Sequence, residues 1–355
     1  MFAIDFGARS IKVAKLVKTG NGYELDNYGA AFSPEGGIAD GEIINPIATA
    51  DVLEDLLSEI GMRDRRAMVA ITGQKVIVRE ISLPLMEEKE LMSGVMWEAP
   101  KYVPYDLDEA IIDAEKVDEY TEKDGNKMMR VLLVATPKNV VHPYMEVLKK
   151  ARLIPKIVDI VSSANIRTFS NDLFDEIEEK KDGSLINIIL SMGASSTILT
   201  LAEKNHLKFS RDILVGGNDM TNAIAKSQNI SFTEAEALKR KTGITLEAEE
   251  EDKKHNEIEK NILKIANQIT KEVRKSLNYF KTQSQKVKYN KMILSGGCAN
   301  IKNIDKFLGE HFEIPTVIGD PLKQIAIDER SFKMERIEKL KGSLATVIGL
   351  AKREK

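Results

Sequence analysis

The sequence predicts an α/β fold of two duplicated halves around a cleft, with a small α+β module inserted into the first half. Residues 2–16 and 186–202 share one design: a strand, a Gly-centred polar turn and a second strand. Residues 84–160 have their own order of helix, strand, strand, helix and strand, as an inserted module would. Because the two hairpins match in pattern rather than in strict sequence, two unrelated hairpins remain the alternative.

The composition is that of a globular protein large enough for two domains, with 355 residues, 43% of them hydrophobic and 30% charged. A net charge of −3 gives no reason to expect nucleic-acid binding, which needs a basic face. Cys298 is the only cysteine, which excludes an intramolecular disulfide and a cysteine-built zinc site. The sequence has no apolar run of about 18 residues and no signal-peptide core, so we expect a cytoplasmic protein without direct membrane insertion.

The first hairpin carries a polar turn between two apolar strands. Gly7 can adopt backbone angles that a side chain forbids, and it lets a ligand approach the main chain. The amides of residues 8–10 can form a small anion cradle, with Ser10 and Lys12 adding side-chain donors. Asp5 ends the first strand and is placed to hold a hydrated divalent cation. An ordinary hairpin with a solvated turn is the alternative.

Helical and alternating hydrophobic periodicities predict the other elements of the first half and the module. For the first half they are strands 23–32, 67–72 and 76–83 and helix 49–60. For the module they are helices 87–98 and 138–151 and strands 110–117, 128–135 and 155–160.

The rest of the chain is predicted in the same way, beginning with a helix over 162–179. Its expected strands are 186–190, 198–202, 207–213, 292–294 and 315–317, and its expected helices are 216–225, 232–242, 258–280, 304–312 and 344–351. Asn218 or Asp219 is the candidate cap of one helix and Thr233 that of the next. The charge run 247–260 predicts a solvated excursion.

The third Gly motif, Ser295 to Ala299, follows an apolar strand. Gly296 and Gly297 remove side chains that would keep a flat ring from the backbone, so a base or its ribose is the natural occupant. A strand–helix turn with a close packing contact is the alternative. Cys298 is expected to be a small packing residue, because no His or basic partner is evident nearby in the sequence.

Glu236 and Lys239 lie three residues apart and therefore on one face of the 232–242 helix. From spacing alone, a surface ion pair is the favoured interpretation.

The three Gly motifs, in the order in which they occur and with a module after the first strands, resemble those of the actin-like ATPase superfamily. More closely, they resemble the PilM family of type IV pilus assembly proteins, relatives of the division protein FtsA. The similarity runs over essentially the whole chain. Its motifs are residues 4–12 and 191–197 for phosphate, 295–299 for adenosine, and 212–219, 235–239 and 344–351.

The resemblance implies an actin-like fold with an SHS2-like module, and a site for ATP and Mg²⁺. The expected division is 1–83 and 161–185 for domain I, 84–160 for the module and 186–355 for domain II, with 232–290 as a helical subdomain. The residues that match nucleotide-binding positions are Gly7, Ala8, Arg9, Ser10, Lys12, Ser191, Gly193, Ala194, Ser195, Ser196, Thr197, Gly216, Gly217, Glu236, Lys239, Gly296, Gly297 and Cys298. Glu236 and Lys239 are thereby expected near the ribose and adenine.

One departure from the family pattern bears on catalysis. The second phosphate motif of active members usually begins with Asp, and here that position is Ser191. Asp5 is left to hold the metal through water, with Asp159 as a second candidate catalytic residue; Asp159 as a helix cap is the alternative. We therefore expect binding of ATP with slow hydrolysis or none.

The function implied by the resemblance is an ATP-binding scaffold of the type IV pilus inner-membrane complex, which serves twitching motility. Its expected partner is the N-terminal cytoplasmic tail of a PilN-like membrane protein, which would recruit it to the inner face of the membrane, with other platform components and motor ATPases as further partners. One alternative is an FtsA-like division filament, although such proteins end in an amphipathic membrane helix and this sequence ends at residues 351–355. Another is a small-molecule kinase, with Asp212 or Asp219 as base.

Overall fold

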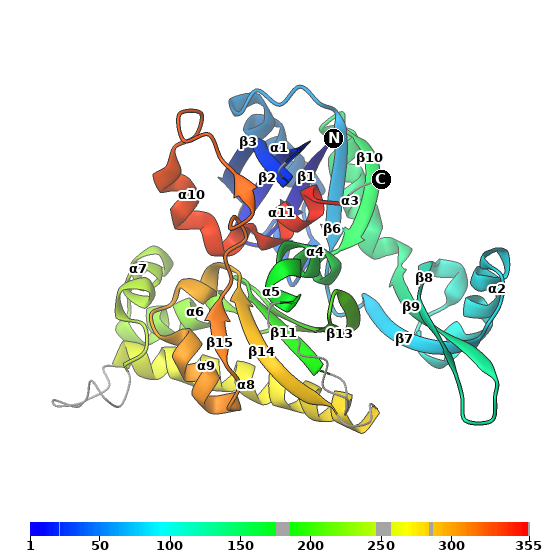
Figure 1. Cartoon of the computed structure of the whole chain (residues 1–355). Coiled ribbons are helices and arrows are strands. Elements are labelled where there is room, and N and C mark those ends of the chain that lie inside the picture. The colour runs from blue at the N-terminus through cyan, green and yellow to red at the C-terminus, as the bar shows by residue number, and fades with distance from the viewer. Residues whose placement is uncertain (21, 175–184, 246–256, 284–286, 354–355) are drawn as a thin grey trace.

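The computed structural model describes residues 1–20, 22–174, 185–245, 257–283 and 287–353, and its two large sheets form the body of the molecule (Figure 1). Within these residues the first sheet has the order β10 (Ile154–Ile160), β6 (Arg66–Ile71), β1 (Phe2–Phe6), β2 (Ser10–Thr19), β3 (Gly22–Phe32) and β16 (Ile325–Ala326). The second has the order β15 (Thr316–Ile318), β14 (Lys288–Ser295), β11 (Leu185–Met192), β12 (Thr197–Glu203), β13 (His206–Ile213), β7 (Ile77–Pro84), β9 (Lys127–Pro137) and β8 (Ala110–Thr121). A short ribbon pairs β4 (Ile38–Ala39) with β5 (Glu42–Ile43).

Both faces of the first sheet are covered, because successive side chains along its strands point alternately into two different cores. Phe2, Ile4 and Phe6 of β1 point into a core shared with α1 (Pro46–Glu59) and α3 (Lys138–Lys150). Ala3, between them, points into the core under α4 (Val161–Thr168) and α11 (Ala345–Ala351). Burial on both faces explains the near-continuous apolar run of this strand.

The two sheets repeat one topology, which confirms the predicted duplication. In each, a hairpin is extended by a third antiparallel strand on one side and by two parallel strands on the other. The matching orders are β10-β6-β1-β2-β3 and β15-β14-β11-β12-β13. The polar turns of the two hairpins therefore occupy equivalent places in the two halves.

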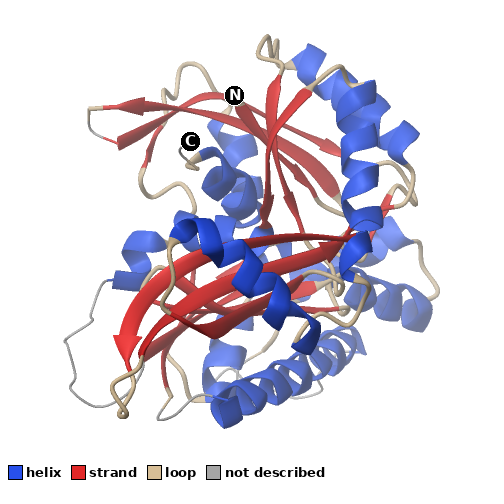
Figure 2. Cartoon of the chain, turned by 90° about the vertical axis from the view of Figure 1, so that its right-hand side faces the viewer, coloured by secondary structure: helices blue, strands red, loops and turns tan. Residues whose placement is uncertain are grey.

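The second sheet carries the longest helix of the described residues, α8 (Glu257–Gln283) (Figure 2). Its buried stripe, with Ile262, Ile269 and Val273 among its members, packs on Ile188 and Leu201 of the strands. Three more helices join this core: α6 (Gly217–Gln228), α7 (Phe232–Thr242) and α9 (Ile304–Phe312). The opposite face packs on α4 and α5 (Ser170–Phe174), where Phe169 and Leu173 lie in the core of the first half.

The inserted segment forms a core of its own from α2 (Glu88–Glu98), η1 (Ala99–Lys101), η2 (Leu107–Glu109), β8 and β9. The predicted boundary between domain I and the module, at residue 84, places β7 in the first half. In the structure, however, β7 pairs with β9 from Ile77 to Pro84. It therefore belongs with the module strands β9 and β8 of the second sheet, and the pairing favours a boundary before residue 77. Local periodicity identified this strand but could not identify its neighbour.

The other differences are local. The helix predicted over 162–179 is divided into α4 and α5, and residues 175–184 lie outside the described part, as do residues 246–256 of the predicted solvated excursion. Ser231, and not Thr233, caps α7, because its hydroxyl accepts from the Glu234 amide at 3.3 Å. The sequence did not predict α10 (Met334–Leu340), η4 (Gly297–Asn300) or η5 (Lys341–Leu344).

Candidate functional site

The two predicted phosphate turns have the same backbone geometry. The amide of Gly7 donates to the carbonyl of Ser10 at 3.2 Å, and the amide of Gly193 donates to that of Ser196 at 2.8 Å. A Cβ atom on Gly7 would lie 3.0 Å from the Ser10 oxygen, and one on Gly193 would lie 2.9 Å from the Ser196 oxygen. Both turns therefore require glycine at their first position.

The tips of both turns present free backbone donors. Within the described residues, the amides of Ala8 and Arg9 donate no hydrogen bond, and the same holds for Ala194 and Ser195. Successive amides without acceptors are the arrangement that binds anions. The residues at the turns thus fit the phosphate groups of a nucleotide.

Asp5 and Lys12 face each other across the first hairpin. The Lys12 ammonium donates to the Asp5 carboxylate at 2.9 Å and to the Ser10 carbonyl at 3.2 Å, and it is 5% exposed. It lies directly under Gly7, whose added Cβ would be 3.2 Å away. An ammonium has three protons, so one remains for an anion on the turn. The second Asp5 oxygen has no hydrogen bond to any of the described residues, and it can accept from a metal-bound water.

The second turn is held by the start of α6. The amides of Gly217 and Asn218 donate to the carbonyls of Gly193 and Ala194 at 3.0 and 2.7 Å. A Cβ on Gly216 would lie 2.6 Å from the Ala194 oxygen, so the helix can approach this closely only with glycine there. In this geometry Gly216 and Gly217 shape the turn, because these first amides of α6 are already used.

The hydroxyl of Thr197, at the end of the same turn, is buried and donates to the carbonyl of Val215 at 2.8 Å. It fastens the turn to the segment before α6.

Glu236 and Lys239 form a buried pair, 7% and 4% exposed, rather than the surface ion pair that spacing favours. The Lys239 ammonium lies 2.6 Å from the Glu236 carboxylate and donates to the Thr221 hydroxyl at 2.9 Å and the Gly217 carbonyl at 3.0 Å. Arg240 donates to the other Glu236 oxygen at 2.9 Å. The network joins α7 to the start of α6 and hence to the second turn.

Burial of the Glu236 carboxylate raises its pKa, but hydrogen bonds from Lys239 and Thr221, with the charge of Lys239, outweigh this effect. They lower the pKa of Glu236 to about 2. The carboxylate is therefore ionised at neutral pH and holds Lys239 in place.

The third Gly motif meets this network at Cys298. Its thiol donates to the carbonyl of Gly193 at 3.3 Å, and a Cβ on Gly217 would lie 2.4 Å from its sulfur. Gly296 has a φ of 84° and packs against Met192, whose oxygen would be 2.3 Å from an added Cβ. Gly297, in contrast, has no heavy atom within 4 Å of an added Cβ. Open space at this glycine fits a flat ring.

Burial raises the pKa of the Cys298 thiol, and the charges of Lys239, Arg240 and Arg9 lower it. The hydrogen bond of this thiol to Gly193 joins the third Gly motif to the second, and Cys298 is a packing residue between them.

Ser191 and Asp159 both have side-chain partners within the protein. The Ser191 hydroxyl, 9% exposed, accepts from the Asn165 amide at 2.8 Å. The Asp159 carboxylate accepts from the Ile160 amide at 2.7 Å and from Arg167, and it forms an ion pair with Arg353 at 2.8 Å. These contacts argue against Asp159 as a group that orients water. They argue equally against Asp159 as a helix cap, because its carboxylate connects Arg167 of α4 to Arg353 near the end of the chain.

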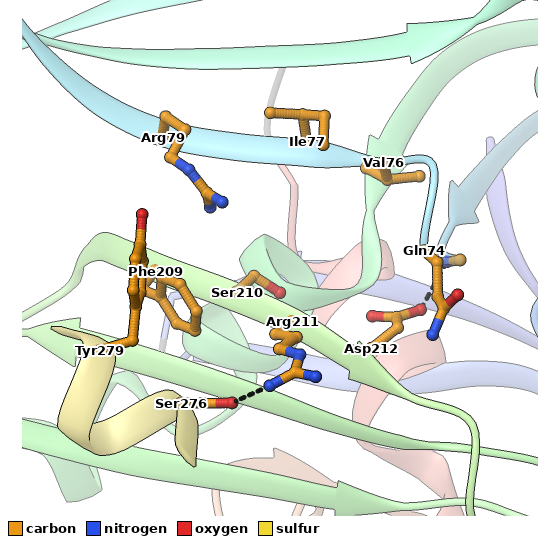
Figure 3. A pocket seen from close by; sticks show the side chains of 11 residues that line it. Gln74, Val76, Ile77, Arg79, Phe209, Ser210, Arg211, Asp212, Ser276 and Tyr279 are labelled. Atoms are coloured by element: carbon orange, nitrogen blue, oxygen red, sulfur yellow. Dashed lines mark hydrogen bonds between the residues drawn. The ribbon is translucent and has the colours of Figure 1, made fainter. Parts of the chain in front are cut away.

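Sequence reasoning missed a cavity of about 390 Å³ elsewhere in the fold (Figure 3). It lies between β7, β13 and α8, and none of the residues matched to nucleotide-binding positions lines it. Asp212 does line it, but its carboxylate accepts from Thr72 and the Gly73 amide, each at 2.5 Å. The residues come from three distant segments, so no local signal could have identified the cavity.

Over the described ranges, no group of three or more His, Cys, Asp or Glu side chains is arranged to hold a metal directly. In the same ranges, no helix is long and apolar enough to cross a membrane.

The fold is that of the actin-like ATPases. It is similar to the ethanolamine utilization protein EutJ from Carboxydothermus hydrogenoformans, at 14% identity over 99% of this chain and 88% of that one, with a TM-score of 0.54. It is also similar to MreB 5 of Spiroplasma citri bound to AMPPNP, at 14% identity over 98% of this chain and 93% of that one, with a TM-score of 0.51.

Within this class, the family model of the type IV pilus assembly protein PilM matches residues 3–355, and the chain belongs to that family. A solved PilM-PilN type IV pilus biogenesis complex contains a similar chain, at 25% identity over 99% of this chain and 97% of that one. The TM-score of that pair is 0.81.

Proposed function

We propose that the protein is an ATP-binding, actin-like scaffold of the type IV pilus inner-membrane assembly platform. The observation that carries the proposal is the pair of equivalent turns with free tip amides, one in each half. Triphosphate bound between them would contact both halves and so favour their closed arrangement, since a ligand shifts conformation by its differential affinity. The AMPPNP-bound state of the similar MreB 5 supports a nucleotide here.

The nucleotide would be oriented by the residues around the turns. Lys12 and the first tip amides hold the outer phosphates, and Asp5 holds Mg²⁺ through water. Gly297 leaves room for the base. Glu236 and Lys239 hold each other, and through the start of α6 they keep the second turn in shape.

Hydrolysis is expected to be slow or absent. The hydroxyl of Ser191 stands where active members carry Asp, and it is bound to Asn165. Asp159 is bound by two arginines. Asp5 is then the one carboxylate of the predicted set that can organise a metal and its water, and a missing carboxylate at such a site costs several kcal/mol of transition-state stabilisation.

The partner we propose is the N-terminal cytoplasmic tail of a PilN-like membrane protein, as the solved PilM-PilN complex suggests. A groove of about 440 Å³ beside the module, between β8 and the start of α3, offers a docking place. It is lined by Ile111, Lys138, Asn139, Val141, His142 and Met145. Ile111 is 44% exposed there, so apolar side chains of an extended peptide would cover it. Binding would recruit this cytoplasmic protein to the inner face of the membrane, where other platform components and motor ATPases could join it.

The kinase alternative loses its candidate bases in this geometry. Asp212 accepts from Thr72 and Gly73, and Asp219 accepts from the Gly216 amide at 2.8 Å. Both carboxylates have structural partners, so neither is set to deprotonate a substrate. No feature of the described residues favours the FtsA-like alternative over the scaffold.

The test is a fluorescence titration of a labelled peptide from the N-terminal tail of a PilN-like protein, with and without Mg-ATP. Ile111→Glu and Met145→Glu should each weaken binding by about tenfold or more, because each places a charge in an apolar groove. Val17→Glu, at a residue 44% exposed on β2, is the matched control and should bind like the wild type. Failure of the peptide to bind the wild type would contradict the proposed partner. Equal binding to the wild type and all variants would contradict the proposed groove.

A further inference from the structure

The cavity between β7 and β13 lies where these two strands separate. Within the described residues, these strands pair at one position, Phe209 with Arg79. Beyond that pair the strands diverge, and the cavity of about 390 Å³ opens between Ile77 and Arg211. Ser276 and Tyr279 of α8 line it as well (Figure 3).

Three parts of the chain meet at this cavity. Gly73 and Gln74 follow β6 of the first sheet, Arg79 belongs to β7 at the start of the module part of the second sheet, and Arg211 belongs to β13 of the second half. A molecule bound here would touch all three. Small-molecule sites occur preferentially at such junctions, and their usual volumes of roughly 300–1,000 Å³ include this one.

Two arginines line the gap: Arg79 extends from β7 toward it, and Arg211 of β13 extends toward Ser276 of α8 (Figure 3). Arg79 donates to the Val78 carbonyl at 2.9 Å and lies over the Phe209 ring at 5.5 Å, and no ion pair to it occurs among the described residues. Arg211 donates to the Ser276 hydroxyl at 2.9 Å and to Glu272 at 3.0 Å. Each guanidinium has five N–H donors, so most of them remain available.

The rest of the lining orients a ligand. Asp212 stands away from the two guanidinium groups, next to Gln74, and its carboxylate is already bound by Thr72 and Gly73 (Figure 3). It would repel an anion from that end. Tyr279 is 49% exposed, and its ring centroid lies 6.2 Å from that of Phe209. A planar ring can pack against the open part of this tyrosine.

We infer that this cavity binds a small planar anion, a ring bearing a phosphate or a carboxylate group, with the anionic group between Arg79 and Arg211 and the ring against Tyr279. Both acids suit a guanidinium fork, which pairs bidentately with either. The bound molecule ties the module strands of the second sheet to its other strands, at the point where β7 and β13 share the one backbone pair Phe209 with Arg79. This site is separate from the proposed nucleotide site.

The experiment uses the full chain with phenyl phosphate and benzoate as two probes, and with benzyl alcohol as the uncharged control. Hydrogen–deuterium exchange locates binding, and calorimetry measures affinity. We expect at least one acid to protect residues 73–79 and 207–213 while leaving residues 4–12 unchanged, and benzyl alcohol to protect neither. The acid that binds more tightly shows whether the site prefers a phosphate or a carboxylate group.

Arg79→Gln and Arg211→Gln should each weaken the better probe by about tenfold or more, the usual effect of a charge-assisted contact. Tyr279→Ala should weaken it by a smaller factor without loss of folding, because this side chain is half exposed. Arg330→Gln, at an arginine whose side chain is 92% exposed, is the matched control and should change nothing. Protection confined to residues 4–12, no uptake of either acid, or wild-type affinity in both arginine variants would overturn the inference.

Discussion

Glu236→Gln should reveal how firmly α7 holds the second turn. The variant keeps the shape of the side chain and removes its charge, so Lys239 is left buried without its carboxylate. The pKa of Glu236 is lowered from 4.5 to about 2 in the folded protein. A shift of about 2.5 units at 1.36 kcal/mol each corresponds to about 3 kcal/mol of unfolding free energy at neutral pH, as an order of magnitude.

The pH dependence follows from the direction of the shift. A carboxylate with a lowered folded-state pKa stabilises the protein above the unfolded-state value of 4.5, and this contribution is lost as the pH falls toward 2. The difference in unfolding free energy between wild type and Glu236→Gln should therefore be about 3 kcal/mol at pH 7 and should shrink steadily below pH 5.

The assay is urea unfolding followed by far-ultraviolet circular dichroism at a series of pH values. Glu310→Gln, at an exposed glutamate of α9 with no ion pair among the described residues, is the matched control and should match the wild type throughout. A difference for Glu236→Gln that is below about 1 kcal/mol at pH 7, or that does not change with pH, would refute the assignment of this pair as a buried, mutually stabilising one.

Three further predictions concern packing and the nucleotide. Gly349→Ala should lower the unfolding free energy by about 3 kcal/mol, because an added Cβ would lie 1.7 Å from the Ala164 carbonyl oxygen. Gly20→Ala is the control, because no heavy atom of the described residues lies within 4 Å of its added Cβ. Equal urea midpoints for the two variants would contradict the close approach of α11 to α4. Lys12→Ala should weaken ATP more than ADP in calorimetry, by roughly ten- to a hundredfold, whereas equal weakening would assign Lys12 to support of the turn alone. Ser191→Asp should raise the rate of phosphate release at saturating magnesium, and that rate should depend more steeply on the magnesium concentration than in the wild type. Asp5→Ala is the inactive control. Wild-type turnover of about 1–10 per second would contradict the proposal of a slow ATPase.

Much of the fold could be predicted because its signals are local. The helices predicted over 232–242 and 304–312 have the predicted bounds, although the cap of the first is Ser231 and not Thr233. The two polar turns were identified because glycine between apolar strands is a pattern of a few adjacent residues. Their equivalence in the folded chain comes from the repeated order of strands, which the sequence suggested only as a similarity of pattern.

What could not be predicted depends on neighbours distant in the sequence. Strand β7 pairs with β9 and touches β13, and nothing in residues 77–84 identifies either neighbour. The partners of Asp159 are Arg167 and Arg353, and the second of these comes from the far end of the chain. The burial of Glu236 with Lys239 was equally invisible, because a spacing of three residues is the same for a surface pair.

The measurement that tests the central proposal most directly is calorimetric titration of the wild type and two Gly297 variants with Mg-ATP. Gly297→Ala should bind like the wild type, because no heavy atom lies within 4 Å of the added Cβ. Gly297→Glu should fill the space proposed for the base and abolish uptake, while its far-ultraviolet spectrum matches that of the alanine variant. No heat of binding for the wild type, or full binding by the folded glutamate variant, would contradict a nucleotide between the two turns.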